Sequence, residues 1–347
     1  MGNNTSITEH KRHYYRELLC IGVPIIIGQL GTIILGFADT LMIGHHSTEE
    51  LAAAGLVNNI ITFILVSYMG FSYGLTPIIG KLYGMEKTDK IGQKVKNSFF
   101  ANMVVGVIFS LALIILYFNL HRIGQPEELL ALIRPYFIVN LISVLFVGVF
   151  NTLKQFLDGI GNTKVAMWVM IMGNIVNIFG NWVLIYGVGP CPEMGLLGAG
   201  ISTLASRVLM AVAMVGIIAV TKEYREYRNN IIASRINGAD FREMNRLGWP
   251  VALQLALESG AFTLSCVMVG WLGTIPLAAH QVMITISQLF YLVLSGMAAA
   301  LAIRVSHFVG QNDFAAVRRN AYDGWRLNLL FSLCMGIPVL LLRHQIG

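Results

Sequence analysis

Charged residues are scarce in this sequence. Asp, Glu, Lys and Arg make up only 12% of its 347 residues, whereas 56% are apolar and the mean hydropathy is +0.68. A soluble domain of this length would carry about twice that share of charge. Many windows hold around 20 residues with almost no charge, the length that crosses roughly 30 Å of hydrocarbon. The composition therefore predicts an all-α polytopic membrane protein.

Other absences exclude further classes. The short alternating strands that a closed β-barrel needs are not found. The four cysteines show no CxxC or Cys/His spacing, so we expect small buried hydrophobic residues and not a metal site or disulfide framework. Histidines are scattered, which disfavours a membrane-embedded enzyme. The net charge of +6 would suggest a nucleic-acid partner for a soluble chain, but here it mainly reflects the loops.

Nine apolar segments are predicted to span the membrane. Loops that hold basic residues alternate with loops that are nearly free of Lys and Arg. Because basic loops face the cytoplasm, the N-terminus is predicted to be cytoplasmic. The predicted spans are 18–44, 51–80, 96–119, 130–153, 165–188, 196–220, 246–272, 277–307 and 322–342, and the loops with basic residues are 81–95, 154–164, 221–245 and 308–321.

The sequence repeats itself once at long range. The offset of 226 positions that separates Pro24 from Pro250 also places Gly296 on Gly70 and Gly310 on Gly84. The first copy holds six predicted spans and the second three, so three further spans are expected to be missing and the chain to be C-terminally truncated. Copies with an even number of spans share one orientation and are related by a two-fold axis along the membrane normal. We place an N-lobe at 1–228 and an incomplete C-lobe at 229–347.

Two acids lie inside apolar spans, Asp39 in the first and Glu258 in the seventh. A carboxylate at that depth costs roughly 2.5–3.5 kcal/mol on insertion scales, so such acids usually line a site. Neither has Lys or Arg at helical spacing in its own span. The alternative is an acid near the interface or hydrogen-bonded between helices. The acids are not repeat equivalents, because Asp39 aligns with Ser265.

Three asparagines in the fifth span share one helix face, since Asn174, Asn177 and Asn181 recur at i, i+3 and i+7. Amide oxygens can complete a shell around a small hard cation, although interhelical hydrogen bonding is the simpler explanation. Thr203 lies among small residues that also suit close helix packing. The unpaired acid in the same lobe favours a shared site.

Other polar side chains in apolar spans are candidates for lining a substrate cavity. For the pair in the eighth span, packing or a local hydrogen bond is the alternative to a proton relay. The candidates are Gln29, Asn58, His280 and Gln281.

These residues resemble those of the MATE (multidrug and toxic compound extrusion) transporters, most closely the NorM-like branch. Single motifs are weak, but together and in order they cover nearly the whole chain. They are P-x4-Q at Pro24 and Gln29, GFADTLMIG around Asp39, LDGIGNTK at 157–164, NIFGNW at 177–182, LAAHQ at 277–281 and AIRVSHFVGQ at 302–311.

The resemblance implies a monomeric, non-enzymatic antiporter of a bacterial inner (plasma) membrane, with two six-helix lobes around a cavity that opens alternately to either side. It implies export of cationic, amphipathic compounds in exchange for Na+ or H+, with no cofactor beyond the coupling ion. By position, Asp39 matches the N-lobe acid, Asn177, Asn181, Asn174 and Thr203 its partners, and Glu258 a C-lobe ligand, so Na+ would bind at Glu258 or Asp39. The family's C-lobe site also uses an acid in span 10, which this chain lacks.

Other functions are less consistent with the residues. A flippase for lipid-linked sugars would favour a cationic cavity to hold pyrophosphate, and the spans of the first copy contain almost no Lys or Arg. A receptor or channel is a third possibility, but duplicated halves of six spans suit alternating access better.

Overall fold

A computed structural model describes residues 2–123 and 126–341, and for 2–14 only the course of the helix. All regular elements in these ranges are helical, as predicted. They are α1 (Gly2–His46), α2 (Thr48–Tyr73), α3 (Leu75–Gly84), α4 (Thr88–Phe118), η1 (Leu120–Ile123), α5 (Glu127–Gly159), α6 (Thr163–Tyr186), α7 (Gly195–Val220), η2 (Lys222–Tyr224), α8 (Arg225–Ala233), α9 (Gly238–Gly270), α10 (Thr274–Gly310) and α11 (Phe314–Leu341).

Helix ends follow from local chemistry. Ser47 caps α2, because its hydroxyl oxygen accepts hydrogen bonds from the backbone N–H groups of Glu49 and Glu50. α6 ends where Gly187 adopts a left-handed conformation with φ of 65°, which glycine reaches without steric cost. Asn237 caps α9 through Ala239 N–H.

Eight helical segments within the described residues are long and apolar enough to cross a membrane. They correspond to the first eight predicted spans. The second is divided at Gly74 into α2 and α3. The ninth predicted span, 322–342, overlaps α11, which is not among these eight segments, and its last residue lies outside the described part.

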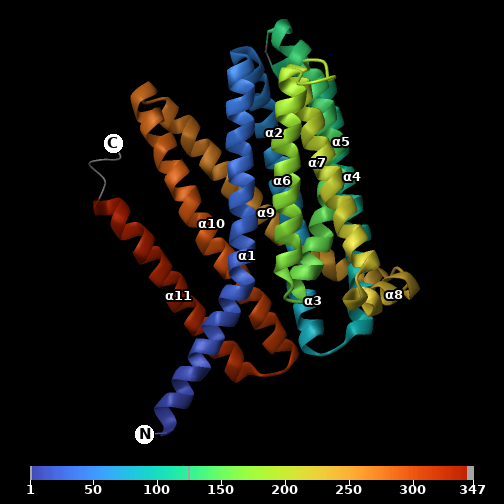
Figure 1. Ribbon diagram of the computed structural model, residues 1–347, viewed down its shortest axis with the longest axis vertical. Coiled ribbons are helices and arrows are strands. Elements are labelled where there is room, and N and C mark those ends of the chain that lie inside the picture. Colours follow the sequence, from blue (N-terminus) through green and yellow to red (C-terminus); the bar gives the residue numbers. More distant parts are fainter. Residues whose placement is uncertain (1, 124–125, 342–347) are drawn as a thin grey trace.

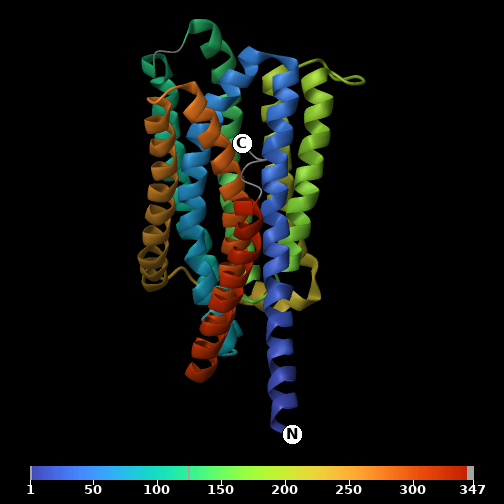
Figure 2. The same cartoon turned by 90° about the vertical axis from the view of Figure 1, so that its left-hand side faces the viewer.

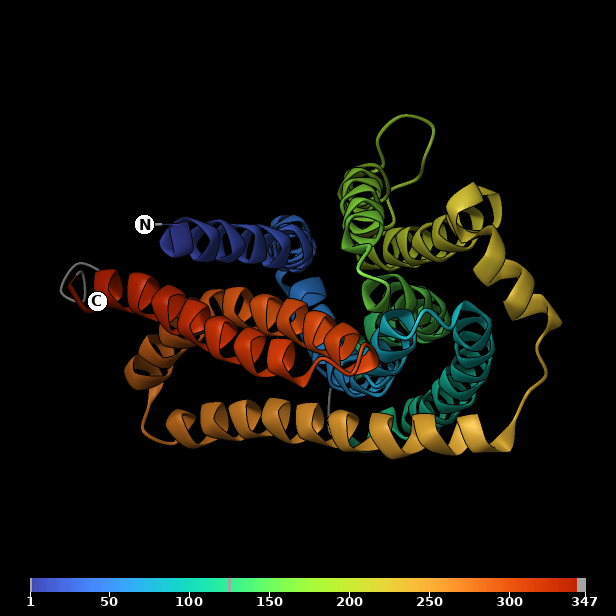
Figure 3. The same ribbon diagram turned by 90° about the horizontal axis from the view of Figure 1, so that it is seen from below.

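Most helices run along the long axis of the molecule (Figure 1). We call α1–α7 the N-lobe helices and α9–α11 the C-lobe helices. The C-lobe helices diverge from α1 and α2 toward the upper end in Figure 1. The first turns of α1 project beyond the other helices at the lower end (Figure 2). Seen from below, α9 lies along one side of the molecule and α6 and α7 along the opposite side (Figure 3).

The two lobes meet through contacts that obey the 226-residue offset. On one side, a Cβ at Gly22 would lie 2.7 Å from Met297 Sδ, so α1 closely approaches α10. On the other, a Cβ at Gly248 would lie 2.7 Å from Phe71 Cδ2, so α9 closely approaches α2 in the same way. Gly248 is the repeat equivalent of Gly22 and Met297 of Phe71. A second mirrored set is Gly296 against Ile26 and Gly70 against Ala252.

At the lower end the mirrored contacts converge on residues that are each other's equivalents. Gly80 of α3 faces its equivalent, Ser306 of α10, and a Cβ at Gly80 would overlap the Ser306 hydroxyl. One turn further, Gly84 meets its equivalent Gly310, 2.9 Å from the Cβ position there. The pseudo-two-fold axis therefore passes through this crossing. We call these four residues the axial crossing.

One hydrogen bond also joins α10 to α5 next to the axial crossing. His307 Nε2 lies 2.7 Å from the backbone oxygen of Gly159 at the end of α5. The His307 ring also packs against Tyr83, with ring centroids 4.9 Å apart. The lower ends of α3, α5 and α10 thus form one packed unit.

The predicted loop 221–245 is partly helical and is fixed to the N-lobe. Asp240 accepts hydrogen bonds from Lys94 Nζ at 2.6 Å, Gln93 Nε2 at 2.7 Å and Asn97 Nδ2 at 3.2 Å. The predicted lobe boundary between 228 and 229 falls inside α8. The long connection is therefore anchored to α4 at its C-terminal end.

The prediction that the cysteines are buried is wrong for two of them, because Cys20 and Cys334 are exposed. In a bilayer the outer surface of the bundle faces acyl chains, so exposure of apolar side chains costs little. All four cysteines are free.

Candidate functional site

Asp39 lies near the upper end of α1, facing α6. Its Oδ1 accepts a hydrogen bond of 2.5 Å from Asn181 Nδ2. Asn181 also donates to Asn177 Oδ1 at 3.1 Å, one turn earlier on α6. Asn177 in turn contacts Thr203 Oγ1 of α7 at 3.1 Å. The structure therefore brings four of the predicted site residues into one polar cluster.

The close approach of α6 and α7 makes this cluster possible. A Cβ at Gly180 would lie 2.5 Å from Ser202 Oγ, so only glycine lets α7 come this near. Ser202 Oγ donates to the backbone oxygen of Asn177 at 2.7 Å, and Asn177 Nδ2 lies 3.4 Å from Ser206 Oγ. The small residues around Thr203 thus serve both packing and polar contact.

Two amide groups can act on Asp39. In the reverse orientation of its amide, Asn177 donates to Asp39 Oδ1 at 3.1 Å and accepts from Thr203 Oγ1 at 3.1 Å. Asn177 and Asn181 are fully buried. Asn181 Oδ1 is buried without a hydrogen-bond partner among the described residues. A buried acceptor next to a carboxylate is matched by a cation or by a proton.

Asn174 does not join the cluster. Its side chain packs against Gly31 of α1, where a Cβ would lie 2.7 Å from Asn174 Nδ2. That Nδ2 is buried and has no partner in the described part of the chain. All three asparagines lie on α6, but Asn174 packs against Gly31 of α1, whereas Asn181 bonds to Asp39 two turns further along α1.

Polar side chains missed by the sequence analysis extend the cluster below Asp39. Arg207 of α7 donates from a guanidinium nitrogen to Ser143 Oγ of α5 at 2.5 Å. Tyr136, also on α5, donates to Asn58 Oδ1 of α2 at 3.0 Å. Arg207 interacts electrostatically with Asp39 and with Tyr136. The sequence could have indicated this extension of the cluster, because Arg207 is a lone arginine in the middle of the apolar span 196–220.

Glu258 belongs to a separate place, where α9 faces α10. Its carboxyl group interacts with the Tyr291 hydroxyl of α10, and Tyr291 interacts electrostatically with Tyr73 at the end of α2. No described residue links Glu258 to the Asp39 cluster through a hydrogen bond. The two predicted acids thus lie in different surroundings, one in each lobe.

The four predicted cavity residues are dispersed. Gln29 bridges the lobes, because its Oε1 lies 3.5 Å from Ser295 Oγ of α10. Asn58 is the acceptor of Tyr136. Gln281 donates to Cys266 Sγ of α9 at 3.2 Å. His280 Nε2 is buried without a partner in the described ranges.

A model of one protein family matches this chain over residues 24–183 and again over residues 250–347. The two matched segments begin at the two repeat-equivalent prolines and cover well over half of the sequence. The chain belongs to the MatE family. It is therefore a multi-pass membrane protein of a transporter family.

Two NorM relatives share moderate identity with it. The probable multidrug resistance protein NorM of Photorhabdus laumondii is 31% identical over 324 residues, which is 93% of this chain and 71% of the relative. The multidrug resistance protein NorM of Photobacterium profundum is 27% identical over 97% of this chain and 74% of its own length.

Solved MatE-type structures share the fold. A MATE transporter crystallised in complex with MaD3S superposes with a TM-score of 0.86 at 20% identity, covering 96% of this chain and 74% of the other. An outward-facing multidrug resistance MATE transporter of the MOP superfamily gives 0.82 at 19% identity, covering 96% and 73%. At these identities the similarity establishes the arrangement of helices.

In this MatE chain, the prediction that 154–164 is a loop is wrong at its start. α5 continues to Gly159, and Lys154 Nζ forms an ion pair of 2.6 Å with Asp158 one turn on. The pair is nearly buried, with side-chain exposures of 15% and 4%. The i, i+4 spacing of Lys154 and Asp158 is typical of a helix, so it could have been used to extend the predicted span.

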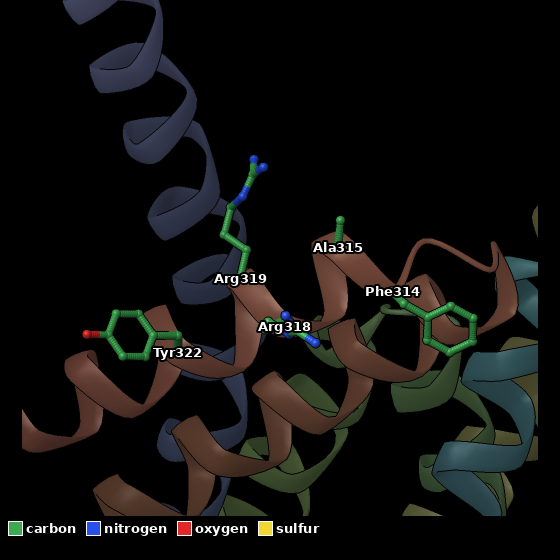
Figure 4. Close-up of a pocket in the computed structure, with 5 residues that line it drawn as sticks. All are labelled: Phe314, Ala315, Arg318, Arg319 and Tyr322. Carbon is green, nitrogen blue, oxygen red and sulfur yellow. The ribbon is translucent and has the colours of Figure 1, made fainter.

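Two surface hollows lie away from the polar cluster. One, of about 610 Å³, is at the start of α11 and carries two arginines (Figure 4). Another, of about 460 Å³, lies beside the axial crossing, where Arg304 pairs with Glu17 at 2.7 Å. No group of three or more His, Cys, Asp or Glu that could hold a metal occurs among the described residues.

Proposed function

We propose that this MatE chain exports cationic, amphipathic compounds in exchange for Na+ or H+ by alternating access. The observation that carries the proposal is the hydrogen bond of the buried Asn181 to Asp39 inside the membrane-spanning bundle, with the buried Asn177 bonded to Asn181. The names of its NorM relatives add support, since both are multidrug resistance proteins. The coupling ion is a transported substrate, and no resident cofactor is needed.

A Na+ ion or a proton would bind on the carboxylate of Asp39. Carboxylate, amide and hydroxyl oxygens are hard ligands that suit such a cation. Asn181 presents Nδ2 to Asp39 in this structure and leaves its Oδ1 without a partner. Rotation of that amide would present Oδ1 to a cation held by Asp39. Thr203 and the Asn177 oxygen would complete the shell.

Exchange requires that drug and ion disfavour each other's binding. Each ligand shifts the balance between inward-open and outward-open states only through its different affinity for the two. We therefore propose that Asp39, Glu258 or both release the cation before or as the drug binds. Gln29, at the contact between α1 and α10, is a candidate for sensing the drug, because its side chain bridges the two lobes.

The orientation follows the positive-inside rule. The axial crossing, α8 and the basic loops lie at the lower end in Figure 1, which would face the cytoplasm of a bacterial inner membrane. The crossing closes that end, so the state described here would be open toward the outside. We propose that the monomer is the transporting unit.

The test is gradient-driven ethidium efflux from vesicles under an imposed Na+ or H+ gradient. Asp39→Asn together with Glu258→Gln should abolish the gradient dependence, and each single variant shows which lobe carries the coupling. Efflux by the double variant at the wild-type rate would refute the proposal.

A lipid-linked sugar flippase is the alternative, and it would need free interior cations for a pyrophosphate. In the described N-lobe, the interior cations Lys154 and Arg207 each act on an acid, Asp158 and Asp39 respectively. This arrangement favours the antiporter over the flippase.

A further inference from the structure

Arg207 occupies an unusual position for a permanent cation. It lies midway along α7, which runs from Gly195 to Val220. A guanidinium does not lose its proton in proteins, so it introduces one fixed positive charge at that depth. A charge inside a membrane bundle is costly and generally marks a functional partner. The proposed exchange reaction, as set out above, gives this residue no task.

The surroundings of Arg207 hold it beside the Asp39 cluster. Its guanidinium donates to Ser143 Oγ of α5 at 2.5 Å. Thr203, one turn earlier on α7, and the adjacent Ser206 both contact Asn177. Arg207 therefore extends the same polar face of α7 that reaches Asn177 and, through it, Asp39.

Arg207 acts on Asp39 without forming a direct ion pair. The two groups attract each other electrostatically, yet no carboxylate of the described residues lies within 4.0 Å of the guanidinium. A contact ion pair would occupy the carboxylate and compete directly with any bound cation. The separation leaves Asp39 accessible while it still experiences the positive charge.

Few other ionisable groups act on Asp39. Tyr136 of α5 is a neighbour, and it is neutral near pH 7. His46 lies at the upper end, two turns beyond Asp39, where its ring bonds to Glu50 and to Glu193. Among the described residues, Arg207 is therefore the permanently charged group that acts on Asp39 from a neighbouring helix.

We propose that Arg207 is a positioning residue for ion release: it keeps Asp39 ionised after the coupling cation has left. This inference rests on the proposed function of Asp39. With Na+ or H+ bound, the cluster carries one net positive charge. After release, Asp39 and Arg207 balance each other, so the empty lobe can change conformation without an isolated carboxylate in the membrane.

The sign of the effect follows from electrostatics. A neighbouring positive charge disfavours a second cation on the same carboxylate. Removal of the Arg207 charge should therefore tighten cation binding at Asp39, on the order of tenfold for the loss of a neighbouring charge. Tighter binding slows release, so exchange should become slower although the cation site is intact.

Cation binding to the purified full chain would test the proposal, read by intrinsic tryptophan fluorescence. Trp182 directly follows Asn181, so it reports on the cluster. NaCl is titrated at fixed pH, and pH is titrated without Na+. Arg207→Met should raise the apparent affinity for Na+ or for H+ about tenfold. Arg207→Lys, which retains the charge, should stay within about twofold of the wild type.

A double variant shows whether the effect acts through Asp39. In an Asp39→Asn background, Arg207→Met should cause no shift, because no carboxylate is present. An equal shift in that background, or no shift in Arg207→Met alone, overturns the inference. If Asp39→Asn keeps the wild-type cation response, the proposed role of Asp39 as the coupling site fails instead, which separates the two failures.

Folding of the variants gives a second readout. If Arg207→Met does not yield folded protein, recovery of folded protein by Arg207→Met with Asp39→Asn supports charge balance between the two. Failure of this double variant to fold, while Arg207→Lys folds, would assign Arg207 a packing role through Ser143 and overturn the inference.

Discussion

Asn181 Nδ2 lies 2.5 Å from Asp39 Oδ1, and this hydrogen bond joins α6 to α1 within the membrane-spanning bundle. The donor is a fully buried neutral amide and the acceptor a carboxylate, so the contact neutralises no charge. A hydrogen bond to a charged group contributes about 1.5–3 kcal/mol. The bond therefore stabilises the ionised acid and still leaves it able to bind a cation.

Asn181→Ala should destabilise the protein by about 1.5–3 kcal/mol and reduce cation-driven efflux. Asn174→Ala is the matched control on the same helix face, because its Nδ2 already lacks a partner in the described structure. Thermal unfolding in detergent and ethidium efflux measure the two effects. Equal losses in both variants would contradict a special role for the Asp39 contact.

Gly84→Val should force the lobes apart at the axial crossing. A Cβ there would overlap the backbone oxygen of His307, and backbone atoms cannot rotate away. Overpacking of this kind costs about 1–3 kcal/mol, seen as a lower midpoint of thermal unfolding. Gly216→Val on α7 is the control, since no atom lies within 4 Å of its Cβ position. A normal midpoint for Gly84→Val would argue against tight closure.

Lys154→Met should leave Asp158 as a buried, uncompensated charge, at a cost of about 3–5 kcal/mol. Replacing both residues, as Lys154→Met with Asp158→Leu, should recover most of that loss. Glu243→Gln is an exposed comparison, because Glu243 pairs with Lys94 while 43% exposed, and such pairs contribute less than about 1 kcal/mol. Denaturation of the purified variants measures all three, and a double variant as unstable as the single one would contradict the paired role.

Asp240→Ala should release the connection between the lobes from α4. Three donors, from Gln93, Lys94 and Asn97, lose their shared acceptor. We expect limited proteolysis within 221–237 to accelerate at least several-fold, since local opening governs cleavage. Glu223→Ala, at an exposed position in the same connection, should leave the rate unchanged. Unchanged cleavage of Asp240→Ala would mean that the anchor contributes little.

Much of the fold was predictable because a bilayer restricts the choices. Long apolar runs can only be helices, and the 226-residue offset identified residues that prove to form mirrored contacts between the lobes. Boundaries were less predictable. The fourth span was predicted to end at 153, whereas α5 continues to Gly159, because the ion pair between Lys154 and Asp158 depends on burial under neighbouring helices.

The candidate site was predictable only in part. Periodicity placed Asn174, Asn177 and Asn181 on one face, but the packing of α1 decides which of them reach Asp39. Arg207 was overlooked because a single basic residue barely changes the hydropathy of an apolar run. Its importance becomes visible only when α5 and α7 bring it beside the acid, a pairing that has no signature in local sequence.

The axial crossing has a consequence for how the two copies can diverge. In a symmetric dimer, residues on the two-fold axis must be identical, so any enlargement occurs on both sides at once. Within one chain the two sides are independent, and the crossing now pairs Gly80 with Ser306. The hydroxymethyl group fits only because its counterpart has no side chain. Two copies within one chain thus permit an asymmetric contact that a symmetric dimer cannot form.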